Sequence, residues 1–141
     1  MKDPRQRIVA AGFIWDEGKV LLAKRATTKT VAPGQYHLPG GHVEFGETVE
    51  AALVREIAEE FGVGIKVLEP FYAFSYVTGE IHTVGIACLA RLTGPRENIC
   101  LKLDEAAEYV WASKEELLRY LGQDSHNYTA AVAGFKHWGR E

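Results

Sequence analysis

The sequence predicts an α/β fold, an α/β/α sandwich in which helices cover a mixed, partly antiparallel β-sheet. Runs rich in β-branched and aromatic residues occur along most of the chain and predict strands. Between them lies a segment with apolar residues every three or four positions, which predicts an amphipathic helix, and two further helical patterns follow toward the C-terminus. A chain of 141 residues without a linker-like segment fits a single domain, so we expect one domain spanning residues 1–141.

The composition is that of a globular protein and limits the partners it can bind. Hydrophobic residues make up 47% and charged residues 25% of the chain, and the net charge is −3. No block of Lys and Arg occurs, so a nucleic-acid polymer is not an expected partner, whereas a small nucleotide needs only one or two cations. The first apolar run, Ile8–Trp15, is too short to span a membrane. Cys88 and Cys100 form no CxxC pair. We therefore expect a cytoplasmic protein that does not contact membranes.

The N-terminal third predicts a hairpin followed by a loop and a short strand. Two apolar runs are joined by Asp16-Glu17-Gly18, a turn sequence, and the polar residues 26–35 predict a loop. The predicted strands here are Ile8–Trp15, Lys19–Lys24 and Tyr36–Leu38.

The strongest helical pattern runs from Val49 to Phe61. Its apolar residues recur at helical spacing, Thr48 is placed to cap its N-terminus, and Gly62 is placed to end it.

The C-terminal half predicts further strands and two more helices. A capping box, Ser113 to Glu116, predicts a helix that ends near Leu121 before Gly122, and Tyr128–Trp138 predicts the last helix. The predicted strands are Ile65–Val77, Glu80–Leu92 and Glu108–Ala112.

Three carboxylates on the first predicted helix indicate a metal site. Glu56, Glu59 and Glu60 are spaced i, i+3 and i+4, so they share one helical face beside the apolar stripe. We expect no basic residue within a turn on that side to relieve their repulsion, whereas a hard divalent cation such as Mg²⁺ would do so. A solvated acidic face is the alternative. The position at the margin of the buried stripe favours the metal site, because an unpaired carboxylate there is costly.

The segment before this helix, Leu38–Glu47, contains three glycines, all within residues 40–46. Glycine allows sharp backbone turns and lets a ligand approach the main chain closely, so Gly40 and Gly41, with His42 after them, are candidates for the substrate site. Alternatively, the segment is an ordinary strand–helix connection and His42 an ordinary loop residue.

Together, these two segments resemble the signature box of the Nudix hydrolase family. The matching positions are Gly41, Glu47, Arg55-Glu56-Ile57, Glu59-Glu60 and Gly62-Val63. The order of the flanking segments also resembles this family, with Leu-Leu-Ala-Lys-Arg before the box and a late strand containing Trp after it. The resemblance implies the Nudix fold and an Mg²⁺-dependent enzyme, with Mn²⁺ as a substitute, that cleaves the diphosphate linkage of a nucleoside diphosphate joined to another group.

The resemblance also implies roles for the residues of the box. The implied metal ligands are Glu56, Glu59, Glu60 and the carbonyl oxygen of Gly40. One of the glutamates, with Glu56 favoured, could instead be the general base, since members of the family differ here. We expect Arg55 to pair with Glu47 and hold the glycine-rich segment against the helix, the alternative being a plain surface arginine.

Candidates outside the box are fewer and less specific. Lys24 and Arg25 stand where related enzymes place a cation for phosphate, although a solvated strand end would also explain them. Glu105 and Glu108 are candidates for an additional carboxylate, and acidic residues at a strand edge are the alternative for both.

Recognition of a base requires an aromatic surface and polar groups. Asp124 and Asn127 lie just before the last predicted helix. Their position along the chain corresponds to the region that contacts the base in MutT-type members. Phe74, Tyr76 and Trp111 could stack a base, although strand aromatics are more often core residues.

The compact chain resembles the small nucleoside-triphosphate pyrophosphatases of the family, which implies hydrolysis of a (d)NTP, canonical or oxidised, to a nucleoside monophosphate and pyrophosphate. Two other readings stay open. One is a Nudix hydrolase of ADP-ribose, a nucleotide sugar or a dinucleoside polyphosphate. The other is a non-catalytic nucleotide sensor. Homodimers are common among small members.

Overall fold

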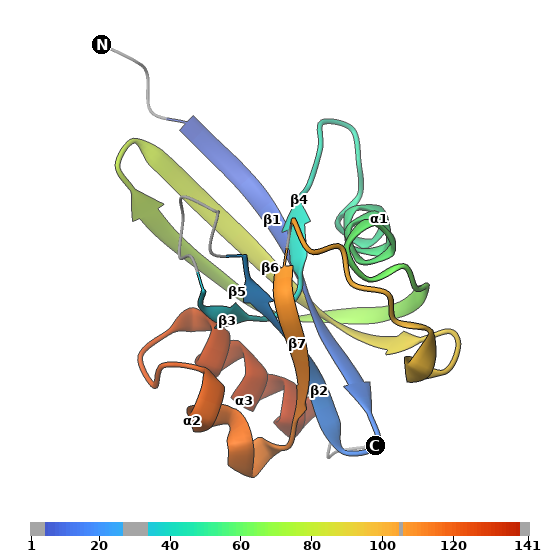
Figure 1. Ribbon diagram of the computed structural model, residues 1–141. Coiled ribbons are helices and arrows are strands. Elements are labelled where there is room, and N and C mark those ends of the chain that lie inside the picture. Colours follow the sequence, from blue (N-terminus) through green and yellow to red (C-terminus); the bar gives the residue numbers. More distant parts are fainter. Residues whose placement is uncertain (1–4, 27–33, 105, 139–141) are drawn as a thin grey trace.

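The computed structural model describes residues 5–26, 34–104 and 106–138. Seven strands and the helices between them follow the predicted order closely (Figure 1). The strands are β1 (Arg5–Asp16), β2 (Lys19–Arg25), β3 (Tyr36–His37), β4 (Gly40–His42), β5 (Ile65–Thr78), β6 (Ile81–Leu92) and β7 (Ala106–Ala112). The helices are α1 (Val49–Phe61), α2 (Leu117–Tyr120) and α3 (His126–Trp138), with short 3₁₀ turns at Arg96–Asn98 and Lys114–Glu116.

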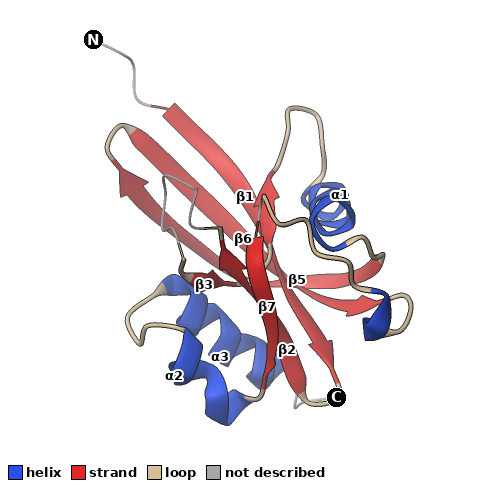
Figure 2. Cartoon of the chain, in the orientation of Figure 1, coloured by secondary structure: helices blue, strands red, loops and turns tan. Residues whose placement is uncertain are grey.

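The strands form a mixed sheet, as the sequence predicts. The order along the sheet is β3-β2-β1-β6-β5, with β4 paired to β1 and β7 paired to β2. The pairing of β1 with β6 is parallel, from Arg5 opposite Ile81 to Ile14 opposite Ala90, and the other pairings are antiparallel. Helix α1 lies on one side of the sheet and α2 and α3 lie on the other (Figure 2).

Each side of the sheet has its own apolar core, because successive residues of β1 point to opposite faces. Phe13 packs in the core beneath α2 and α3, whereas Ile14 packs in the core beneath α1, and both are fully buried. In α1 the buried stripe includes Leu53, Ile57 and Phe61, as the helical pattern predicts. This packing fixes α1 and α3 on the two faces that flank the glycine-rich segment.

Helix α1 begins and ends at the predicted residues. The Thr48 hydroxyl accepts a hydrogen bond from the Ala51 amide (3.0 Å), and Gly62 adopts the left-handed conformation (φ 67°) that favours glycine. The capping box is also present, since the Ser113 amide donates to the Glu116 carboxylate (3.0 Å).

The structure differs from the sequence prediction mainly in the glycine-rich segment. Gly40–His42 forms strand β4 and pairs antiparallel with Val9–Ala11 of β1, where a loop was predicted. Helix α3 begins at His126, two residues before the predicted start. Most of the predicted loop 26–35 lies outside the described residues. Among the described helices, none is long and apolar enough to cross a membrane.

Candidate active site

The glycine-rich strand β4 lies directly against a carboxylate of α1. A Cβ atom added to Gly41 would lie 2.3 Å from the carboxyl carbon of Glu56, so only glycine leaves room for this carboxylate. At Gly40 an added Cβ would lie 1.9 Å from the Ala10 carbonyl oxygen. The two glycines therefore bring bare backbone up to Glu56 on one side and to β1 on the other.

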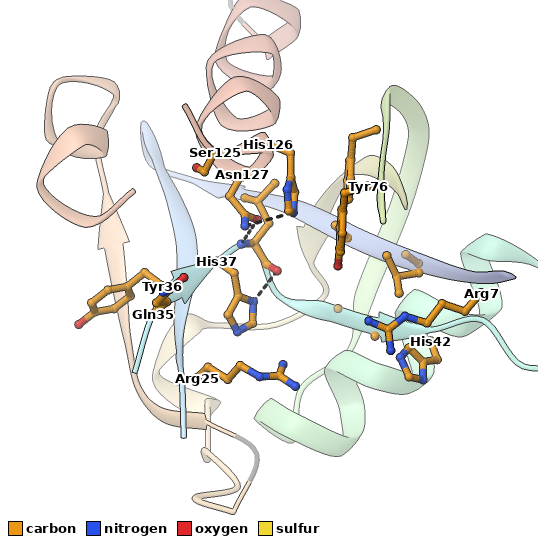
Figure 3. Close-up of a pocket in the computed structure, with 17 residues that line it drawn as sticks. Arg7, Arg25, Gln35, Tyr36, His37, His42, Tyr76, Ser125, His126 and Asn127 are labelled. Carbon is orange, nitrogen blue, oxygen red and sulfur yellow. Dashed lines mark hydrogen bonds between the residues drawn. The ribbon is translucent and has the colours of Figure 1, made fainter. Parts of the chain in front are cut away.

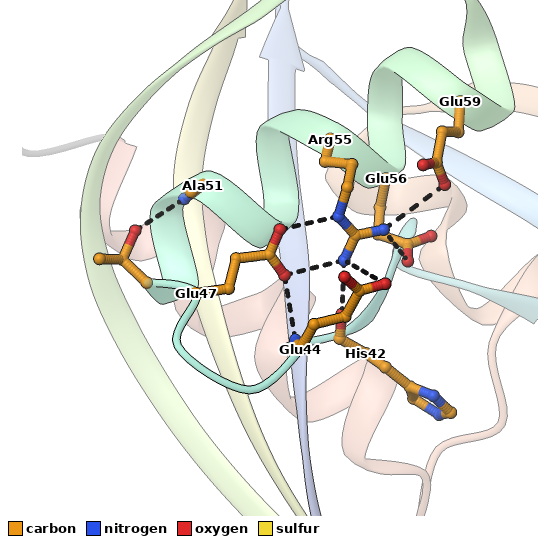
Figure 4. A network of polar contacts seen from close by, with 8 residues as sticks. His42, Glu44, Glu47, Ala51, Arg55, Glu56 and Glu59 are labelled. Atoms are coloured by element: carbon orange, nitrogen blue, oxygen red, sulfur yellow. Dashed lines mark hydrogen bonds and ion pairs between the residues drawn. The ribbon is translucent and has the colours of Figure 1, made fainter.

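Arg55 connects the carboxylates around this point (Figure 4). Its Nε donates to Glu47 (2.7 Å) and its Nη2 donates to the other Glu47 oxygen (2.9 Å), a two-pronged pair. Nη2 also donates to the His42 carbonyl (2.9 Å). The predicted Arg55–Glu47 contact is thus present, and it fixes the segment before α1 to the helix.

The expectation that no basic group relieves the helix carboxylates is wrong. Arg55 Nη1 donates to Glu56 (2.9 Å) and lies 3.5 Å from Glu59. Because Arg55 and Glu56 are adjacent in the helix, their Cα–Cβ bonds point to different sides of it. The long arginine side chain nevertheless bends back along the helix, so that one guanidinium lies within 4 Å of four glutamates, Glu44, Glu47, Glu56 and Glu59.

Burial and hydrogen bonding shift the pKa values of these groups in opposite directions. The hydrogen bonds from Arg55 lower the pKa of Glu47 to about 2, and the pKa of Arg55 is raised in return. Burial raises the pKa of Glu56, although Arg55 acts against this rise. Glu56 is therefore a carboxylate whose burial is only partly compensated by its arginine partner.

The three glutamates among the predicted metal ligands lie at different depths. The Glu59 side chain is 55% exposed and that of Glu56 is 17% exposed, while Glu60 is buried. Within the described residues, no three His, Cys, Asp or Glu side chains form a group that could hold a metal ion. The donors do fit a hard divalent cation in kind, because they are carboxylate oxygens and one of them, Glu56, is half-buried against bare glycine backbone.

A cavity of about 340 Å³ opens beside the two glycines (Figure 3). Strands β1 and β4 form part of it, β5 supplies aromatic side chains, and the start of α3 closes one side. The described residues that line it are Arg7, Val9, Ala10, Ala11, Arg25, Gln35, Tyr36, His37, Leu38, Gly40, Gly41, His42, Phe74, Tyr76, Ser125, His126 and Asn127. Gly41 both lines the cavity and touches Glu56, so the cavity and the carboxylate site are adjacent.

The cavity brings together five of the predicted substrate residues, namely Arg25, Gly40, Gly41, His42 and Asn127. The Nε atom of Arg25 is buried and has no hydrogen-bond partner in the described part of the chain. A buried guanidinium nitrogen without a partner is costly, so this arginine is suited to an anionic ligand.

Other predicted residues lie away from the cavity. Lys24 lies 3.8 Å from Glu108, and Glu108 also accepts a hydrogen bond from the Tyr36 hydroxyl, so the two candidates pair with each other. Asp124 is exposed and is not among the described residues that line the cavity. Glu105 lies outside the described residues.

The aromatic side of the cavity contains a histidine that sequence reasoning missed. His126 stacks on Phe74 (centroid separation 4.4 Å) and on Tyr76 (5.0 Å), and burial lowers its pKa, which favours the neutral ring. Next to it, the Asn127 side-chain oxygen accepts a hydrogen bond from the Leu38 amide (3.0 Å). Trp111, the third aromatic candidate, does not line the cavity and instead packs beneath Arg96.

Arg7 is another charged lining residue that the sequence did not single out. It lies on β1, and its side chain points into the cavity next to His42 and Tyr76 (Figure 3). The predicted strand began at Ile8, one residue after Arg7, and the pairing of Arg7 with Thr83 on β6 is a tertiary contact that the local sequence pattern does not encode.

Comparison with known proteins agrees with this arrangement. The model of the NUDIX domain family matches residues 4–132. Nucleoside triphosphatase NudI of Salmonella newport (strain SL254) is 32% identical over 139 residues, covering 92% of this chain and 98% of the relative.

Solved structures show the same fold. The MutT protein from Methanosarcina mazei Go1 superimposes with a TM-score of 0.80 at 22% identity, covering 100% of this chain and 99% of the other. The E. coli ORF135 protein superimposes with a TM-score of 0.78 at 27% identity, covering 97% of this chain and 94% of the other. With the family model matching most of its length, the chain belongs to the Nudix hydrolase family and is a pyrophosphatase-type enzyme that acts on acid anhydrides in phosphorus-containing compounds.

Proposed function

We propose that this enzyme hydrolyses a nucleoside triphosphate, ribo or deoxy, canonical or oxidised, to a nucleoside monophosphate and pyrophosphate, with Mg²⁺ or, as a substitute, Mn²⁺. One observation carries the proposal. A cavity with aromatic, amide and arginine side chains shares Gly41 with the partly compensated Glu56 carboxylate. The name of the Salmonella relative, nucleoside triphosphatase, supports the same substrate class.

In the proposed reaction, water adds to phosphorus at the diphosphate bridge and the bridging P–O bond breaks. The water proton passes to a carboxylate, for which Glu56 is the best placed, and the leaving oxygen departs with pyrophosphate. A divalent cation bound by Glu59, Glu60 and the Gly40 carbonyl would neutralise phosphate charge, and Glu56 would complete this ligand set if another of the glutamates takes the proton.

The remaining groups bind and position. Arg25 binds phosphate oxygens through its guanidinium, whose Nε is buried, and Arg55 holds Glu56 and the segment before α1 in register. Phe74, Tyr76 and His126 provide the aromatic surface for a base.

A release assay on a panel of substrates with Mg²⁺ tests the proposal. The panel contains canonical and oxidised (d)NTPs, ADP-ribose, dinucleoside polyphosphates and nucleotide sugars, with pyrophosphate and monophosphate measured separately. We expect pyrophosphate from one or a few triphosphates. If the enzyme hydrolyses only compounds in which a nucleoside diphosphate is linked to another group, the triphosphate proposal is wrong and the substrate is one of the alternative Nudix substrates. Nucleotide binding without turnover of any member would instead identify a sensor.

We also propose that the enzyme acts in the cytoplasm. Cys88 is buried, Cys100 is exposed, and both are free thiols, which agrees with a reducing compartment.

A further inference from the structure

A second cavity, of about 580 Å³, adjoins the first along β1 and β4. It is lined by Gln6, Arg7, Ile8, His42, Val43, Glu44 and Val84. Arg7 and His42 line both cavities, so they stand at the junction between them. Among the described residues, no Phe, Tyr or Trp lines the second cavity, whereas the first contains Tyr36, Phe74 and Tyr76. The first cavity is therefore suited to a nucleotide base, and the second is suited to a part of the ligand that contains no base.

Arg7 is held at this junction by a buried hydroxyl. Its Nε donates to the Thr83 hydroxyl (2.8 Å), and Thr83 is fully buried in β6. Arg7 is paired with Thr83 across β1 and β6, and Thr83 is paired with Tyr76 across β6 and β5, so the three side chains share one row on the same face of the sheet. The hydrogen bond limits the directions in which the guanidinium can point.

The two terminal nitrogens of Arg7 have no partner in the described part of the chain. A half-buried guanidinium with its Nη groups free presents a pair of parallel donors, the geometry that matches two oxygens of one phosphate.

No acidic side chain of residues 5–26, 34–104 and 106–138 forms an ion pair with Arg7. Glu44 is the one acidic side chain among the described residues of the second cavity, and it lies 3.9 Å from Arg55, with 70% of its side chain exposed. Gln6 lies against His82 (3.1 Å). Within the described residues, the second cavity therefore contains an arginine held by Thr83, and the acidic group that lines it, Glu44, lies near Arg55.

We propose that Arg7, positioned by Thr83, binds the phosphate groups that leave in the reaction and thereby selects a small anionic leaving group over a second nucleoside or a sugar. This inference rests on the proposed function and names the leaving group that the second cavity accepts. Arg7 is a substrate-contacting, specificity-determining residue, and Thr83 acts through it as a positioning residue.

Direct binding of inorganic pyrophosphate in the presence of Mg²⁺, measured by isothermal titration calorimetry, tests this role without requiring turnover. We expect Arg7→Gln to raise the Kd for pyrophosphate about tenfold to a hundredfold, because a charge-assisted two-pronged contact is lost. Arg7→Lys retains the positive charge but not the two-pronged guanidinium, so its Kd should lie between those of wild type and Arg7→Gln. Thr83→Val, which removes the hydroxyl at nearly constant shape, should raise the Kd severalfold.

The matched control is Arg5→Gln. Arg5 lies two residues earlier on the same strand, is exposed, and is not among the described residues that line either cavity, so the same change of charge should leave the Kd unchanged. Thermal unfolding of all four variants verifies that they fold. An unchanged Kd in folded Arg7→Gln overturns the inference, and so does an equal rise in Arg5→Gln.

Kinetics separate this inference from the proposed function. Arg7→Gln should raise KM for the triphosphate far more than KM for the diphosphate of the same base, because the diphosphate has one phosphate group fewer to place in the second cavity. An equal loss on both substrates would mean that Arg7 contacts another part of the nucleotide, which overturns the inference. If the wild-type protein hydrolyses no triphosphate but binds pyrophosphate through Arg7, the proposed function fails while the anion site stands.

Discussion

At the scale of single residues, Arg55 organises the carboxylate site. One guanidinium contacts Glu47, Glu56 and the His42 carbonyl, and thereby joins α1, the segment before it and β4. The pKa of Glu56 is nevertheless raised, so burial outweighs this arginine at that carboxylate. A metal ion, when bound, would supply the positive charge that Arg55 supplies only in part.

Glu56→Gln tests whether this carboxylate takes part in the reaction. The substitution keeps shape and removes the charge, so we expect kcat to fall by about a hundredfold or more with little change in unfolding temperature. Steady-state kinetics on the substrate identified by the panel provide the measurement. Glu50→Gln, an exposed glutamate in the first turn of the same helix, is the matched control and should keep its kcat. Wild-type turnover in Glu56→Gln would exclude it as base and as ligand.

The Glu47–Arg55 pair should contribute to stability in acid. Its hydrogen bonds lower the pKa of Glu47 to about 2, below the value of an unfolded glutamate. The stabilisation is therefore complete above the unfolded pKa of about 4.3 and is lost as the pH falls toward 2. Urea unfolding between pH 2 and 6 should show that the difference in free energy of unfolding between wild type and Glu47→Gln becomes smaller as the pH decreases. A difference that is constant over this range would contradict the assigned pKa.

At the scale of elements, the sequence predicted what its local pattern encodes. Helix α1 has the predicted bounds because an apolar stripe, a capping threonine and a terminal glycine agree on them. Strand β4 was missed because Gly-Gly-His has little strand propensity. Its pairing with Val9–Ala11 of β1 joins segments about thirty residues apart, which local pattern does not encode.

The two glycines of β4 should tolerate alanine differently. In Gly41→Ala the new Cβ meets the end of the flexible Glu56 side chain, so the carboxylate can move away, and we expect a large loss of kcat with a small loss of stability. In Gly40→Ala the Cβ meets the Ala10 backbone at a φ of 155°, so we expect clear destabilisation.

Chemical unfolding and steady-state kinetics on both variants provide the comparison. Gly122→Ala, where an added Cβ meets no atom within 4 Å, is the control and should match wild type in both measurements. Similar stability losses in the two β4 variants would contradict the different environments that we assign to these glycines.

At the scale of the whole molecule, the cavity is assembled from segments distant in the chain. Arg7 comes from β1, Phe74 and Tyr76 come from β5, and His126 comes from the start of α3. The sequence identified the box, whose residues are local to one helix and its preceding segment. It did not identify Arg7 or His126, because their roles depend on sheet register with Thr83 and on the docking of α3, which are tertiary properties.

The docking of α3 should therefore control substrate affinity. An added Cβ at Gly134 would lie 2.3 Å from the ring of Phe13, which is fully buried and packs edge-on against Phe135. Alanine gains up to about 1 kcal/mol of helix propensity, but overpacking a rigid core costs about 1–3 kcal/mol. We expect Gly134→Ala to lower the free energy of unfolding and to raise KM, because a displaced α3 carries His126 and Asn127 with it.

The neighbouring variant Ala133→Gly separates displacement from destabilisation. Ala133 lies on the same helix and is half-buried, so glycine there should cost about 1 kcal/mol through helix propensity alone without pushing α3 off the sheet. Chemical unfolding should show both variants destabilised, and only Gly134→Ala should show a raised KM. If KM rises equally in both, lowered stability itself weakens binding. If it rises in neither, the start of α3 keeps its place when the helix is strained, and the cavity depends on the Asn127–Leu38 hydrogen bond more than on the packing at Phe13.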